Sequence, residues 1–146
     1  MNDEIKKLFN YDVDKKYDLT DKNILCKEDV YFTTDVMQYL MDNGYNVNEI
    51  TFCNAIEHCD IDLVDYLFFE KNCKFSKYST YDAAYVGCLV LLEMFHQYNF
   101  MKLDNKGIWR YVKNNQNNFI FDYGLIEEAK QGGCPDCIEY VQDILE

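Results

Sequence analysis

The sequence predicts an all-α fold in which short helices form pairs that stack into a solenoid. The central stretch 51–75 contains two short helices back to back, and the second has apolar residues at helical spacing. The motif DVMQYL at 35–40 precedes DLVDYL at 62–67 by 27 residues, and LVLLEM at 89–94 follows after another 27. A fixed period of this length is typical of stacked repeats, because one short helix pair cannot bury its apolar face alone.

The first 30 residues do not follow this period. Residues 3–9 predict a short helix, 10–22 a polar loop, and 23–32 either a degenerate helix or a strand. Terminal repeats of a solenoid need an atypical outer face that meets water. We therefore interpret 1–30 as an N-terminal capping segment and 31–146 as the repeat domain.

The repeats predict helices with recognisable ends. Thr33 or Thr34 is expected to cap a helix over 35–43 that Gly44 closes, and Asp60 to cap the helix that follows 51–58. Ser79 or Thr80 is expected to cap a helix over 81–87, and 88–97 to form its partner. The residues predicted to face the core are Val36, Met37, Leu40, Met41, Phe52, Ala55, Ile56, Leu63, Val64, Leu67, Phe68, Val90, Leu91, Met94, Phe95, Ile138 and Val141.

The period fails between 99 and 124, which is either a decayed repeat or an insertion. We predict one helix there over 108–113, followed by the polar loop NNQNN. The pattern then resumes with a short helix from Leu125, a turn at Gly132 and Gly133, and a last helix over 135–145. Pro135 suits the first turn of that helix, where its missing N–H is not needed.

Composition and charge narrow the function. The net charge is −12, with a single arginine, which argues against nucleic acid as a direct ligand and favours a basic protein partner. The longest uncharged stretch near the middle, 83–92, is too short to span a membrane, and the N-terminus does not resemble a secretion signal. We expect an intracellular protein with no membrane association.

The seven cysteines are predicted to be free thiols in a reducing compartment. The motif CPDC at 134–137 is interpreted as a structural turn, with half a zinc site and a redox pair as the alternatives. His58 and His96 are the only histidines and fall at predicted helix ends. No catalytic constellation and no phosphate-binding motif is recognisable. The sequence therefore predicts no enzyme activity, no cofactor and no metal.

The segment GYNVNEITFCNAIEHCDIDLVDYLFFEKNC resembles an ankyrin repeat, with TFCNAI at 51–56 in place of Thr-Pro-Leu-His-Leu-Ala. The 27-residue period, with NCKFSKYSTYDAAYVG and AKQGGCPDCIEYV, is most similar to ankyrin-like repeats of giant DNA viruses of the mimivirus kind. The resemblance covers roughly 31–98 and 119–145. It implies a non-enzymatic protein-binding scaffold of a viral protein, acting in the host cytoplasm or nucleus.

Five residues are the candidate contacts on the concave face of such a scaffold: Tyr45, Asn48, Tyr78, Tyr81 and Tyr85. Tyrosine is favoured at interfaces because it buries a large area at low entropic cost. We expect a monomer when the protein is free. The alternative function is a virion or assembly component packed permanently against another chain, which would instead show an exposed apolar patch and self-association.

Overall fold

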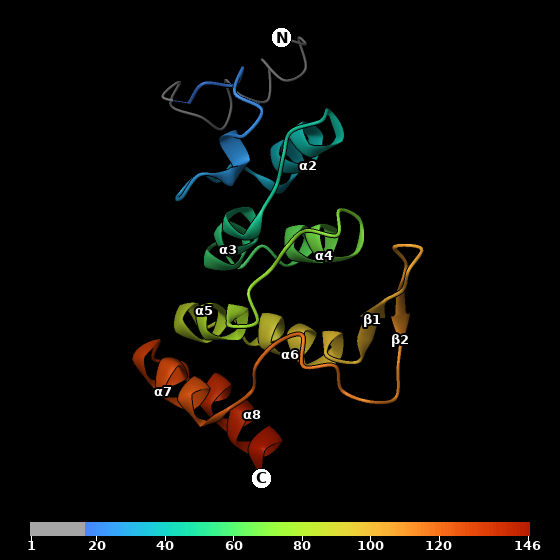
Figure 1. The fold of residues 1–146 in the computed structure, drawn as a ribbon. Coiled ribbons are helices and arrows are strands. Elements are labelled where there is room, and N and C mark those ends of the chain that lie inside the picture. Colours follow the sequence, from blue (N-terminus) through green and yellow to red (C-terminus); the bar gives the residue numbers. More distant parts are fainter. Residues whose placement is uncertain (1–16) are drawn as a thin grey trace. The chain divides into compact units, whose positions relative to one another are not determined.

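The computed structural model describes residues 17–146, and these residues are mostly helical (Figure 1). They contain seven α-helices and one two-stranded antiparallel sheet, which confirms the predicted helical class. The helix expected over 3–9 lies outside the described residues. The chain divides into two compact units, and each is described by itself. The first unit contains the described residues up to Ala55 together with Asp62–Lys74, and the second contains Ile56–Ile61 together with Phe75–Glu146.

The first unit contains α2 and most of α3 and α4. Their bounds are Thr34–Asp42, Glu49–Glu57 and Ile61–Phe69. The Thr33 side chain caps α2 by accepting a hydrogen bond from the Val36 N–H at 3.5 Å, as predicted. The residues of α2 and α4 that were predicted to face inward are all buried. Helical spacing therefore identified the core of this unit correctly.

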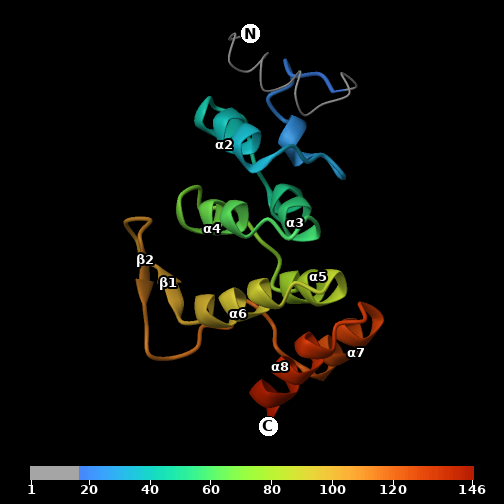
Figure 2. The ribbon, with the colours of Figure 1, turned by 180° about the vertical axis from the view of Figure 1, so that it is seen from behind.

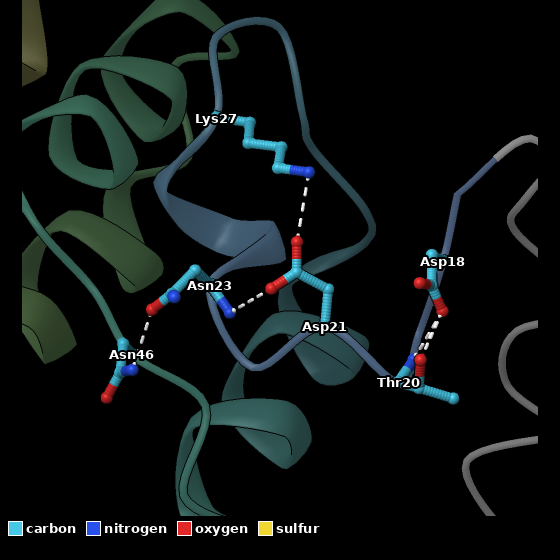
Figure 3. Close-up of polar contacts among 6 residues, drawn as sticks. All are labelled: Asp18, Thr20, Asp21, Asn23, Lys27 and Asn46. Atoms are coloured by element: carbon cyan, nitrogen blue, oxygen red, sulfur yellow. Dashed lines mark hydrogen bonds and ion pairs between the residues drawn. The ribbon is translucent and has the colours of Figure 1, made fainter.

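The segment 17–33 covers one end of the first unit and is organised by short polar side chains. Asp18 and Asp21 accept hydrogen bonds from the backbone N–H groups two residues later, and Lys27 forms an ion pair with Asp21 at 2.9 Å (Figure 3). The Asn46 side chain donates to Asn23 at 2.7 Å (Figure 3). Only one turn of 3-10 helix, Ile24–Cys26, forms where a degenerate helix or strand was expected.

In the first unit, the segment 22–30 is hydrogen-bonded to the loop before α3 and to α3 itself. The Asn46 N–H donates to the Lys22 carbonyl at 2.8 Å, and the Thr51 hydroxyl donates to the Leu25 carbonyl at 2.6 Å. The amide of Asn54 donates to two carbonyls of the same segment, those of Lys27 and Val30. These bonds satisfy backbone groups that the short helices leave without partners.

The second unit contains two helix pairs. The pairs are α5 with α6, Ser79–Val86 and Leu89–Tyr98, and α7 with α8, Tyr123–Gln131 and Pro135–Leu145. Helix α5 packs against α6 and α7, and α8 packs against α6 and α7. The turn after α7 lies so close to the end of α5 that a Cβ atom at Gly132 would clash with the Ala84 and Tyr85 carbonyls. Only glycine fits this contact.

The turns within the helix pairs share one design. Each turn ends with two residues: one with a left-handed backbone, then the N-cap residue of the second helix. These pairs are Gly87–Cys88 and Gly133–Cys134. The turn before α4 has the same arrangement, with Cys59 at φ 49° in the left-handed position. Glycine adopts this conformation without a steric penalty. The predicted turns at Gly87 and at Gly132 and Gly133 are therefore confirmed.

Several predicted core and capping roles are wrong in the second unit. Val90 is 47% exposed, Met94 and Ile138 are half-buried, and Leu92 lies in the core instead. Val90 was misplaced because the run LVLL at 89–92 is apolar on every side, so helical spacing does not decide which of its residues face the core. Ser79 and Thr80 lie inside α5 and are buried, and the Thr80 hydroxyl donates to the Ile120 carbonyl at 2.6 Å.

The helix predicted over 108–113 is wrong, because this stretch is a strand. Strand β1, Met101–Leu103, pairs antiparallel with β2, Trp109–Tyr111. The turn between them is fixed by Asp104, whose carboxylate accepts hydrogen bonds from the N–H groups of Lys106 and Ile108, each at 2.9 Å. Gly107 has a φ of 77°, which completes the turn.

The prediction that all cysteines are free is also wrong. Cys59 and Cys88 form a disulfide whose Cα atoms are 6.0 Å apart. It joins the turn before α4 to the residue that precedes α6, and both residues belong to the second unit. The remaining five cysteines are free thiols.

Candidate protein-interaction surface

Three of the predicted contact residues lie on one face of α5, at its start and along its length. Tyr78, Tyr81 and Tyr85 are spaced three and four residues apart, which places them on the same side of a helix. The rings of Tyr78 and Tyr81 meet edge to face with their centroids 5.5 Å apart. Tyr78 and Tyr85 are exposed, Tyr85 by 56% of its surface, whereas Tyr81 is half-buried. We call these three residues the α5 tyrosine surface.

Tyr81 anchors this surface to α7. Its hydroxyl donates a hydrogen bond to the Asp122 carboxylate at 2.6 Å. The same carboxylate caps α7 by accepting a hydrogen bond from the Leu125 N–H at 3.0 Å. The hydrogen bond to Asp122, followed by burial, raises the pKa of Tyr81 to about 12. Tyr81 therefore holds α5 and the start of α7 together and keeps the neighbouring rings in place.

The charge around the surface is mainly negative. Asp122 and Glu128 both lie close enough to Tyr81 to raise its pKa further by charge repulsion. One cation is near, because the Lys77 ammonium lies 5.6 Å from the centre of the Tyr78 ring. An aromatic surface bordered by carboxylates favours a partner that carries positive charge.

The contact role predicted for Tyr45 is wrong. Its side chain is only 7% exposed, because segment 17–33 covers it. Its hydroxyl donates to the Leu19 carbonyl, and the Lys22 ammonium lies 4.0 Å from the centre of its ring. Burial raises its pKa, followed by the nearby charge of Asp18. No local pattern in the sequence marks this residue as covered.

Asn48 has a structural role in the first unit. Its side-chain oxygen accepts hydrogen bonds from the N–H groups of Ile50 and Thr51, at 2.9 and 3.2 Å, and both donors lie in the first turn of α3. Its carbonyl accepts from the Cys73 thiol at 3.2 Å. Its side chain therefore holds the start of a helix, and its role as a contact residue stays a prediction.

The CPDC motif forms a helix start. The Cys134 sulfur accepts a hydrogen bond from the Cys137 N–H at 3.3 Å, and Pro135 occupies the first turn of α8. Burial, followed by the hydrogen bond with Cys134, raises the pKa of Cys137 to about 12. A thiol with this pKa is protonated at neutral pH, whereas the thiolate is the reactive form. The arrangement agrees with the interpretation of the motif as a structural turn.

The two histidines lie in different environments. His58 is exposed in the turn before α4, whereas His96 is half-buried among the rings of Phe100, Phe121 and Tyr140. Across residues 17–146, no three Cys, His, Asp or Glu side chains come together in a way that could hold a metal ion. None of the helices in this part of the chain has the length and apolar character of a membrane span.

Sequence reasoning missed exposed apolar residues in the second unit. Those on the hairpin of β1 and β2 are Leu103, Ile108 and Tyr111, and Tyr123 begins α7. A turn signal, Asp-Asn-Lys-Gly at 104–107, stands between two short runs rich in apolar and aromatic residues. This signal predicts a hairpin, but a helix was predicted over 108–113 instead.

Comparison with known proteins does not assign the chain to a family. No protein-family profile, curated protein or solved structure matches it.

Proposed function

We propose that this protein is a non-enzymatic protein-binding module of the ankyrin-like kind, and that it binds a partner through the α5 tyrosine surface. The observation that carries the proposal is the alignment of Tyr78, Tyr81 and Tyr85 on one helix face, with two of the rings exposed. In an ankyrin-like stack, α5 and α7 are the first helices of their pairs, and their outer side is the concave one.

Further observations support an ankyrin-like arrangement for the second unit. Its helix pairs have short helices, a left-handed residue in each turn, and first helices that pack against each other. The loop before α5 contacts the loop before α7 through a hydrogen bond from the Ile120 N–H to the Lys77 carbonyl, at 2.8 Å. The Asn46–Lys22 contact in the first unit has the same character.

The partner we propose is a protein segment with net positive charge. The chain carries a net charge of −12, and carboxylates border the α5 tyrosine surface. Opposite charge speeds the encounter of two proteins, and the effect weakens as salt screens it. We place the protein inside the cell, in the cytoplasm or nucleus of a virus host, as the resemblance to viral repeat proteins implies.

The test is a binding measurement with and without the exposed rings. The partner is isolated by affinity purification from the producing cell, and the affinity of the purified partner is then measured for Tyr78→Ala, Tyr85→Ala and the double variant. We expect the double variant to lose roughly tenfold or more in affinity, since aromatic anchors carry most of the energy of an interface. We also expect the association rate of the parent protein to fall with salt.

The matched control is Tyr111→Ala, which removes an even more exposed ring from the hairpin instead of α5. It should bind the partner as tightly as the parent protein does. If Tyr111→Ala weakens binding while the Tyr78→Ala, Tyr85→Ala double variant does not, the α5 tyrosine surface is not the binding site.

The alternative function is a permanent assembly component. It requires an exposed apolar patch, and the hairpin of β1 and β2 supplies one in the second unit.

A further inference from the structure

We propose that the hairpin of residues 101–113 is a self-association surface, and that it docks into a groove between α7 and α8 of a second copy of the chain. The hairpin and the groove are both distinct from the α5 tyrosine surface, so this inference goes beyond the proposed function. It also departs from the expectation that the free protein is a monomer.

The hairpin has one apolar face and one basic face. Its register pairs Met101 with Tyr111 and Leu103 with Trp109, and side chains paired in this way lie on the same face. The opposite face carries the Lys102–Arg110 pair. Tyr111 is 71% exposed and Leu103 is exposed, as is Ile108 next to the turn. A two-stranded hairpin is only marginally stable in water unless its apolar face is covered.

The turn holds the hairpin in a defined shape. The Asp104 carboxylate accepts the two backbone N–H bonds already described and also forms an ion pair with the Arg110 guanidinium at 2.7 Å. The backbone N–H of Ile108 and then Arg110 lower the pKa of Asp104, so it stays ionised at neutral pH. A hairpin fixed in this way loses little conformational freedom when it binds.

The charge of the hairpin is opposite to that of the rest of the chain. Residues 101–113 contain four basic residues and one acidic residue, a net charge of +3. Ten basic and 25 acidic residues remain elsewhere, a net charge of −15. The exposed lysines are Lys102, Lys106 and Lys113. Another copy of this chain is therefore a strongly complementary surface for the hairpin.

The groove between α7 and α8 has the features that such a hairpin needs. It is open to solvent, has a volume of about 460 Å³, and is lined by Tyr123, Ile126, Glu127, Lys130, Gln142 and Glu146. The Tyr123 ring is exposed and offers an apolar contact. Glu146 and Glu127 bring negative charge, and Glu127 forms an ion pair with Lys130 at 3.4 Å. Residues 123–146 contain six acidic residues and one basic residue, a net charge of −5.

The hairpin cannot reach its own groove. In both ribbon views it extends from the C-terminal end of α6 and points away from α7 and α8 (Figures 1 and 2). Each chain therefore presents a hairpin and a groove at separate places. Two chains related by a two-fold axis can exchange hairpins reciprocally, which occupies both surfaces in a closed dimer.

The experiment is sedimentation velocity of the full chain over a range of protein concentrations, at about 50 mM and about 500 mM NaCl. We expect the average mass to rise above 17.4 kDa with concentration at low salt, and to fall towards it at high salt. Lys106→Glu in the hairpin and Glu127→Lys in the groove should each raise the dissociation constant roughly tenfold.

The controls change the same charge at exposed sites elsewhere. Lys74→Glu and Glu70→Lys lie in the first unit, and they should associate like the parent protein. The Tyr78→Ala, Tyr85→Ala double variant should also associate normally, which separates this inference from the proposed function. Circular dichroism checks that each variant is folded.

Three results would overturn the inference. A mass of 17.4 kDa at every concentration would show that the hairpin does not drive self-association. Equal weakening by the matched controls would show only a general effect of charge. Weakening by Lys106→Glu but not by Glu127→Lys would exclude the groove and point to direct pairing of two hairpins.

Discussion

At the scale of single residues, a covalent link between Cys59 and Cys88 constrains the second unit. The two cysteines are 29 residues apart in the sequence, and each occupies a position defined by a helix-pair turn. Cys59 has the left-handed conformation, and Cys88 lies directly before α6. The number and spacing of cysteines cannot predict such a pair, because it depends on how close two turns come in the fold.

The disulfide leads to a prediction about thiols and stability. Thiol titration of the denatured, unreduced protein should find five free cysteines. Reduction should lower the free energy of unfolding by about 3–4 kcal/mol, since the link closes a loop of roughly 30 residues. Urea denaturation with and without reductant measures this change.

The control for that experiment is the Cys59→Ser, Cys88→Ser double variant, whose stability should not respond to reductant. Seven free thiols in the parent protein would contradict the disulfide and support the prediction from the sequence that all seven cysteines are free.

At the scale of elements, the sequence predicted best where local signals were strong. The bounds of α8 agree with the prediction because Gly132, Gly133 and Pro135 mark its start. Helix α6 was placed correctly but its buried face was not, since four consecutive apolar residues give no preferred side. The buried face of α6 is instead determined by the residues that pack against it. The Phe119 ring, for example, stacks on Phe95 with centroids 4.4 Å apart. The hairpin was missed because a helix was predicted over 108–113, where the 27-residue period fails.

The buried face of α6 can be tested by paired substitutions in the same helix. Leu92 is fully buried, so Leu92→Ala should cost about 2–5 kcal/mol, as truncations of large core residues do. Val90→Ala should change stability by no more than about 0.5 kcal/mol, because Val90 is largely exposed. Leu67→Ala in α4 should also lower the free energy of unfolding by about 2–5 kcal/mol, since Leu67 is fully buried.

Urea denaturation followed by circular dichroism gives these three free energies. If Val90→Ala lowers the free energy of unfolding as much as Leu92→Ala does, Val90 faces the core, as helical spacing predicts, and the buried face of α6 is not the one that contains Leu92.

At the scale of the whole molecule, the candidate site was predicted in part. Tyr78, Tyr81 and Tyr85 could be predicted because they share one helix face, which sequence spacing determines. Tyr45 and Asn48 could not be judged from spacing, since covering by segment 17–33 and capping of α3 depend on tertiary contacts. The net charge predicts a basic partner, and the basic hairpin was not recognised because the total charge is strongly negative.

The second unit contains two contacts between successive helix-pair turns, and we propose that they repeat one arrangement. The disulfide joins the left-handed residue of one turn, Cys59, to the residue before the next second helix, Cys88. Gly87 and Cys134 hold the equivalent positions one pair later. A Cβ atom on Gly87 would lie 3.5 Å from the Cys134 Cβ, within the range of about 3.5–4.5 Å that disulfides require.

The most direct measurement is therefore thiol titration and disulfide mapping of Gly87→Cys. Cysteine tolerates the left-handed conformation at position 59, so it should be accepted at position 87 as well. We predict a second disulfide, between positions 87 and 134, and four free thiols in place of the five of the parent protein. A folded Gly87→Cys protein with six free thiols and no link between positions 87 and 134 would contradict the repeating arrangement.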